Sequence, residues 1–199
     1  MDLTWVGLVE LICLGMIAGA AGSLTGIGGG LIITPVLTLG FGVPIHQAIA
    51  TSLCCVIATS SGAAASYIEQ RLSDIRLGMT LELATTVGAI SGSLVAAILS
   101  REALAVCFAV LLIYAGGTMV RRSSAAEGAH SDTAQPYQVK RLPLGLCGSG
   151  AAGVISGMLG VGGGVIKVPL MYLVMGVPFK VATATSNFMI GVTAAASAF

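Results

Sequence analysis

The chain has 199 residues, of which 9% are charged and 56% are hydrophobic, and its mean hydropathy is +0.99. Soluble globular domains carry about 25% charged residues, so this composition excludes a water-exposed surface of ordinary size. The lipid bilayer is therefore the expected solvent for most of the chain. The net charge is +1 and aromatic residues are few, so we predict no nucleic-acid partner.

Apolar segments recur along the chain, and a spanning helix needs about 20 such residues. A signal peptide is the alternative at the N-terminus, but residues 1–4 carry no basic side chain, so we expect a retained helix there. The predicted fold class is an all-α polytopic transmembrane bundle. The predicted spanning helices are Trp5–Ala21, Ile45–Tyr67, Gly78–Leu99, Ala103–Val120, Leu142–Leu159 and the segment from Val181 onward.

Two shorter apolar segments, Leu31–Gly42 and Val165–Val177, each contain a proline and follow a glycine-rich stretch. Each segment either crosses the membrane or re-enters it. If the first one crosses, the N-terminus lies outside; if it is re-entrant, the N-terminus lies inside.

One long polar stretch, Arg121–Arg141, separates the apolar segments into two groups. Basic residues flank it at both ends, and positively charged loops favour the cytoplasmic side. We therefore predict a first transmembrane repeat at 1–122, a cytoplasmic linker at 123–141 and a second, incomplete repeat at 142–199.

Small residues recur at every fourth position of two predicted helices. They are Ala84, Gly88, Gly92 and Ala96 in one helix, and Gly145, Ser149, Gly153 and Gly157 in the other. Such stripes let helices approach closely in lipid.

An internal repeat relates the two groups of segments. The motif Gly26–Gly30 matches Gly160–Gly164, and at the same constant offset the segment Gly42–Pro44 matches Gly176–Pro178. The match continues without a gap through Ser52 and Ser186. Coincidence does not keep one register over so many glycines and prolines, so we predict two copies of one unit.

The second unit lacks counterparts for the last two helices of the first, so we expect a C-terminally truncated chain. Each complete unit would hold five apolar segments. If all five cross, the two units face opposite ways across the membrane, as in the inverted repeats of secondary transporters.

Each glycine motif predicts a discontinuous helix. Glycine lets the chain leave helical geometry, and broken backbone at membrane depth is tolerated where it is buried or lines a polar cavity. Free N–H groups after such a break can bind a small anion. The alternative is that the glycines only allow tight helix packing. A phosphate-binding loop is disfavoured because the motif lacks the Lys-Ser/Thr pair and a strand–helix context.

The doubled pattern of glycine motif, proline, Gly-Val-Pro and Ala-Thr-Ser over Gly26–Ser52 and Gly160–Ser186 resembles the sulfite exporter TauE/SafE family of membrane transporters. The resemblance extends over nearly the whole chain. It implies transport of sulfite, sulfonates or related organosulfur anions across a bacterial inner (plasma) membrane by a multi-pass protein. A homo-oligomer and coupling to protons or another ion are compatible with it.

Two charged residues stand at predicted membrane depth. Lys167 follows the second glycine motif, and we propose that it attracts the anion; a snorkelling lysine near a helix end is the alternative. Glu82 is the candidate carrier of a coupling proton, because burial raises the pKa of a carboxyl group; an interfacial acid is the alternative.

Hydroxyl and amide side chains occur at matching places in both units, where they either coordinate substrate or cap and bend helices. The predicted substrate-binding residues are Gly26, Gly28, Gly29, Gly30, Thr51, Ser52, Gly160, Gly162, Gly163, Gly164, Lys167, Thr185, Ser186 and Asn187.

No catalytic constellation and no cysteine or histidine set at metal-ligand spacing occurs in the sequence, so we predict neither an enzyme nor a metal or other cofactor. The five cysteines lie in apolar segments, and we expect them to be small buried hydrophobes. The predicted function is a secondary transporter of a small anion that works by alternating access. An anion channel, a non-transporting membrane subunit and a membrane-embedded enzyme are the alternatives.

Overall fold

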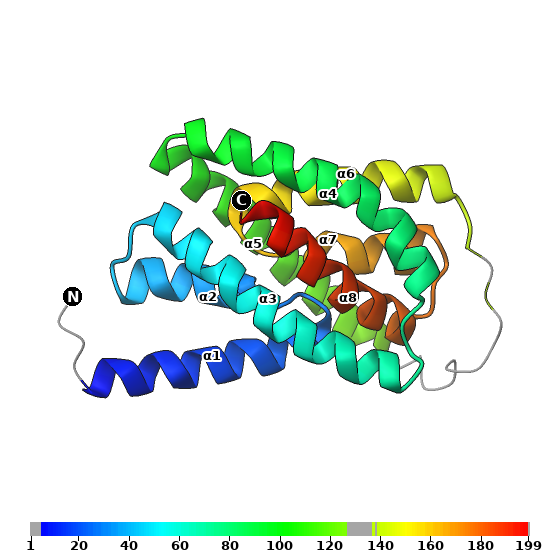
Figure 1. Cartoon of the computed structure of the whole chain (residues 1–199), viewed down its shortest axis with the longest axis horizontal. Coiled ribbons are helices and arrows are strands. Elements are labelled where there is room, and N and C mark those ends of the chain that lie inside the picture. The colour runs from blue at the N-terminus through cyan, green and yellow to red at the C-terminus, as the bar shows by residue number, and fades with distance from the viewer. Residues whose placement is uncertain (1–4, 127–136, 138, 199) are drawn as a thin grey trace.

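The computed structural model describes residues 5–126, 137 and 139–198, and these residues form a bundle of helices with no strand among them (Figure 1). The elements are α1 (Trp5–Thr25), α2 (Gly30–Pro35) continued by a π-helical turn η1 (Val36–Gly40), α3 (Ile45–Glu69), α4 (Ile75–Ile98), α5 (Arg101–Ala126), α6 (Leu142–Leu159), α7 (Gly164–Pro169) continued by a π-helical turn η2 (Leu170–Val174), and α8 (Phe179–Ser197).

Five helices, α1, α3, α4, α5 and α6, are long and apolar enough to cross a membrane. They match five of the six spanning segments predicted from the sequence, all but the one from Val181 onward, and the all-α, multi-pass fold class is confirmed. The remaining long helix, α8, has 19 residues but carries many hydroxyl groups and an asparagine. These polar side chains are buried within the bundle, which makes α8 an internal helix.

Neither short apolar helix can cross a membrane by itself. Gly30–Gly40 would extend over roughly 16 Å as a helix, against a hydrocarbon core of about 30 Å. The start of α1 and the α2–α3 loop nevertheless lie at the same end of the bundle, and the ends of the linker lie at the opposite end (Figure 1). The cytoplasmic location of the linker, and with it the side on which the N-terminus lies, stays a prediction.

Helix α5 ends later than the spanning segment Ala103–Val120 predicted from the sequence. α5 continues to Ala126, one helical turn past the predicted boundary at 122, because the Arg-Arg-Ser-Ser-Ala-Ala segment contains no helix breaker. Of the predicted linker, residues 127–136 and 138 lie outside the described residues.

The outward faces of the helices are apolar. Large exposed side chains include Trp5 on α1, Leu83 on α4 and Val110 on α5, as expected for surfaces that face lipid. The prediction that all the cysteines are buried is wrong, since Cys13, Cys54 and Cys147 are exposed. An apolar solvent removes the reason for burying a thiol.

The most extensive contact between two described helices joins α4 to α6, and it contains residues of both predicted small-residue stripes. On Gly88 and Gly92 of α4, and on Gly153 and Gly157 of α6, an added Cβ atom would collide with a backbone carbonyl oxygen of the opposing helix. The close approach that these stripes predict is therefore confirmed, and it brings α4 against the second half of the chain.

Candidate functional site

The two glycine motifs break their helices in the same way. Each contains three glycines with positive φ, a conformation that side-chain-bearing residues rarely adopt. The φ values are 72°, 85° and 84° at Gly26, Gly28 and Gly29, and 67°, 81° and 73° at Gly160, Gly162 and Gly163. A short helix then restarts at Gly30 and at Gly164. The predicted discontinuous helices are thus confirmed.

The two breaks meet in the core through reciprocal contacts. Ser52 of α3 donates its hydroxyl to the Gly160 carbonyl at 2.9 Å, and its counterpart Ser186 of α8 donates to the Gly26 carbonyl, also at 2.9 Å. Gly30 and Gly164 also pack tightly against the opposite break. A Cβ atom added to Gly30 would lie 2.6 Å from the Gly160 carbonyl oxygen, and a Cβ atom added to Gly164 would collide with the Gly26 carbonyl oxygen. The described geometry therefore gives these glycines a packing role at the contact between the two halves.

The predicted polar residues fall in different surroundings. Thr51 is exposed, and its hydroxyl donates to the Gln47 carbonyl of its own helix at 2.8 Å. Asn187 is buried and donates from Nδ2 to the Ser23 carbonyl at 2.8 Å, while its Oδ1 has no partner. Thr51 thus lies apart from the polar core, whereas Asn187 belongs to it.

Thr185 belongs to a polar node at the start of α4. Asp74 caps this helix by accepting from the Leu77 amide at 3.0 Å, and its own amide donates to Thr185 Oγ1 at 3.0 Å. The Tyr137 hydroxyl donates to Asp74 Oδ2 at 2.5 Å. Partial burial and this bond to Asp74 raise the pKa of Tyr137, so the phenol stays protonated and keeps donating. The node ties the linker to α4 and α8.

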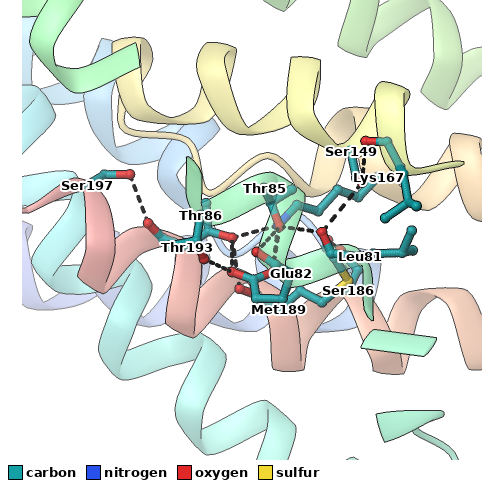
Figure 2. Close-up of polar contacts among 12 residues, drawn as sticks. Leu81, Glu82, Thr85, Thr86, Ser149, Lys167, Ser186, Met189, Thr193 and Ser197 are labelled. Atoms are coloured by element: carbon teal, nitrogen blue, oxygen red, sulfur yellow. Dashed lines mark hydrogen bonds and ion pairs between the residues drawn. The ribbon is translucent and has the colours of Figure 1, made fainter. Parts of the chain in front are cut away.

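Lys167 of α7 and Glu82 of α4 lie together inside the bundle (Figure 2). Lys167 is 1% exposed and Glu82 is 6% exposed, and Lys167 Nζ lies 3.4 Å from Glu82 Oε2. Both alternatives raised by the sequence, a snorkelling lysine and an interfacial acid, are therefore wrong. The sequence did not predict that these two residues form a pair, because they are far apart in the chain.

Three threonines complete this cluster (Figure 2). Thr193 of α8 accepts from Lys167 Nζ at 2.6 Å and donates to Glu82 Oε1 at 2.6 Å, so it bridges the two charges. Thr85 donates to Glu82 Oε2 at 2.9 Å, and Thr86 lies 3.4 Å from Oε1. Sequence reasoning missed Thr193, although it matches Thr59 at the repeat offset.

An unpaired hydroxyl group lies in the same region of the bundle. Ser156 of α6 is fully buried, and its Oγ has no hydrogen-bond partner. It borders Lys167 across Gly163, since a Cβ added to Gly163 would lie 3.2 Å from Ser156 Cβ and 3.5 Å from Lys167 Cε. Buried polar atoms normally find partners, so this hydroxyl is available to a ligand.

Two further features of the described residues lie apart from this cluster or concern metal binding. No group of three or more His, Cys, Asp or Glu side chains that could hold a metal ion occurs among them. A groove of about 520 Å³ runs between α1 and α3, bordered by Ser23, Thr59 and Tyr67 among others. It contains neither Lys167 nor Glu82.

Comparison with known proteins identifies the family. The family model described as Sulfite exporter TauE/SafE matches residues 11–199. The chain is 30% identical to the Probable membrane transporter protein YunE of Bacillus subtilis, with 93% of this chain and 74% of the relative aligned. It is 31% identical to a Probable membrane transporter protein of Methanocaldococcus jannaschii, over 92% of this chain and 68% of the relative.

No solved structure matches the chain at a significant level. The family match covers nearly the whole chain, and the five helices of membrane-spanning length and composition agree with a membrane transporter family. The chain is a multi-pass membrane protein that belongs to the sulfite exporter TauE/SafE family of membrane transporters.

Proposed function

We propose that the chain forms a secondary transporter of a small anion in a bacterial plasma membrane, with Lys167 as the group that attracts the anion. The observation that carries this proposal is the burial of the Lys167 ammonium group among apolar helices, where it contacts the Thr193 hydroxyl and the Glu82 carboxylate. A charge inside a membrane protein is costly and commonly marks a substrate or ion pathway. The family description names sulfite, so sulfite and simple sulfonates are the first compounds to test.

Alternating access around the two breaks is the proposed mechanism. The halves of the chain touch there through glycine backbone and through the hydroxyl groups of Ser52 and Ser186. A hydrogen bond of this kind contributes about 1 kcal/mol net. Losing two of them is compatible with two conformations that differ by a few kcal/mol. In transporters with such broken helices, substrate sites lie near the contact between the repeats.

The first test is uptake of radiolabelled sulfite and methanesulfonate by proteoliposomes that contain the purified chain. We expect saturable uptake and counterflow, in which unlabelled anion on the inside accelerates entry of the label. Lys167→Met should lower uptake by about 10–100-fold, because a hydrogen bond to a charged group is worth about 1.5–3 kcal/mol. Lys180→Met is the matched control, since Lys180 is an exposed lysine on α8.

The outcomes separate the alternatives. Flux without saturation or counterflow would favour a channel. Absence of any sulfur-anion flux in wild-type liposomes would exclude a transporter of these anions, as expected for a non-transporting subunit. Uptake that survives Lys167→Met unchanged would remove Lys167 from the site. Thermal unfolding of each variant in detergent shows whether it is folded.

A further inference from the structure

The Glu82 carboxylate occupies the position that a bound oxyanion would take in this cluster. Oε2 accepts from Thr85 at 2.9 Å and lies 3.4 Å from Lys167 Nζ, while Oε1 accepts from Thr193 at 2.6 Å (Figure 2). An ammonium group and hydroxyl donors would bind the oxygens of a sulfite or sulfonate in the same way. Glu82 thus acts as an internal anion in an oxyanion site.

A second possible donor for an external anion, the Ser156 hydroxyl, lies on the other side of the lysine. The Ser156 hydroxyl has no partner there, and Gly163 places no side chain between Ser156 and Lys167. An anion at this point would receive bonds from Lys167 Nζ and Ser156 Oγ.

Among the described residues, Lys167 is the charged side chain that pairs with Glu82. Glu82 contacts Lys167 of α7 and Thr193 of α8, and its helix α4 also packs against α6. Among the described titratable side chains on these elements and on η2, Cys147, Tyr172 and Lys180 are exposed, and no contact joins them to Glu82. On α4 itself, Arg76 is exposed near the start of the helix.

Two anions cannot share this lysine while both are charged. In a water-poor interior, like charges that compete for one partner force one of the groups to become neutral. A sulfonate remains ionised over the working pH range, whereas a carboxylate can take up a proton. Binding of the sulfonate must therefore neutralise Glu82.

We propose that a small oxyanion and one proton occupy the site together, an inference that rests on the proposed transport function. The anion replaces Glu82 on Lys167 Nζ, and a Glu82 carboxylate oxygen takes a proton from the aqueous side to which the site is open. On the other side the anion and the proton leave, and the Glu82–Lys167 pair forms again. The site has no net charge when empty or when loaded with a monoanion, so each monoanion crosses with one proton.

The first measurement is proton uptake on binding. Methanesulfonate is titrated into the purified wild-type chain at neutral pH by calorimetry, in Tris and in imidazole buffers with gluconate as counter-ion. These cationic buffers add no sulfonate competitor and differ in ionisation enthalpy. We expect about one proton taken up per anion bound, and binding without proton uptake would overturn the proposal. This measurement needs no variant.

The second measurement separates coupled transport from exchange in proteoliposomes. Glu82→Gln should lower methanesulfonate accumulation driven by a pH gradient by at least about tenfold, because the empty site would hold an uncompensated buried ammonium group. Exchange of internal for external methanesulfonate should persist, since the loaded site stays neutral. Glu10→Gln is the matched control, an exposed acid on α1.

Each outcome has one meaning. Accumulation by Glu82→Gln that still follows the pH gradient would overturn the exchange of Glu82 for the anion while leaving the transporter intact. A wild-type chain that neither binds nor transports methanesulfonate or sulfite would overturn the proposed function, and this inference with it. If Glu82→Gln does not fold, the wild-type proton count decides.

Discussion

Thr193 forms hydrogen bonds with both buried charged residues of the bundle, Lys167 and Glu82. Its hydroxyl accepts from Lys167 and donates toward Glu82, and its carbonyl accepts from Ser197 at 2.8 Å. A buried ion pair is stabilising only when further hydrogen bonds satisfy its remaining donors and acceptors. Thr193 supplies these bonds to both partners, which indicates that the pair depends on α8 as well as on α4 and α7.

Thr193→Val should destabilise the protein by about 1–3 kcal/mol, because it keeps the shape of the side chain but leaves an ammonium group and a carboxylate each short of one partner. The free energy of unfolding in detergent measures this. Thr80→Val is the matched control, since the Thr80 hydroxyl bonds only the Arg76 carbonyl on an exposed part of α4. Equal stability of the two variants would show that Thr193 does not support the pair.

Helix α4 belongs to the first half of the chain and packs against α6 and α8 of the second half. It carries Glu82 and packs along α6 through glycines on both helices. The backbones approach so closely that side chains are excluded from the contact. Because Glu82 lies on the same helix, the position of its carboxylate relative to Lys167 depends on this packing.

Gly92→Ala should destabilise the protein by about 1–3 kcal/mol, because its Cβ would collide with the Val154 carbonyl oxygen and push α4 from α6. Gly116→Ala on α5 is the matched control, since an added Cβ there meets nothing within 4 Å. The control should gain up to about 1 kcal/mol from helix propensity. Thermal unfolding of both variants tests this, and a neutral Gly92→Ala would contradict the close contact.

The two halves of the chain contact each other through matched residues at the centre of the molecule. In Figure 1, α3 runs from left to right and its counterpart α8 from right to left. The serine–glycine bonds that join the halves are reciprocal, and both Gly28 and Gly162 face the matched pair Val56 and Ile190. These observations support our proposal that the chain contains inverted repeats.

Ser52→Ala and Ser186→Ala should have similar effects if the halves are related in this way. Each variant removes one bond to a break carbonyl, so we expect about 1 kcal/mol of destabilisation from each and an additive loss in the double variant. Unfolding in detergent provides the values. Ser93→Ala, whose hydroxyl bonds its own helix at Ile90, should be near neutral. A large effect from one serine and none from the other would argue against equivalent halves.

The helices and both breaks could be predicted because their causes are local. Apolar length determines a spanning segment, and three glycines with positive φ interrupt a helix wherever it is packed. The C-terminal end of α5 was not predicted, because no glycine or proline lies between Val120 and Ala126, and the surroundings of the helix then determine where it ends.

The sequence by itself determined that this chain is a membrane protein and that it contains two copies of one motif. It also identified Lys167 and Glu82 as charged residues at membrane depth. Only the tertiary structure decided that these charges form one pair, that Thr193 bridges them, and that Thr51 lies outside the core. The physical reason is distance along the chain. Helices α4, α7 and α8 meet through packing between the two halves, and no local pattern records which side chains that packing brings within hydrogen-bond reach.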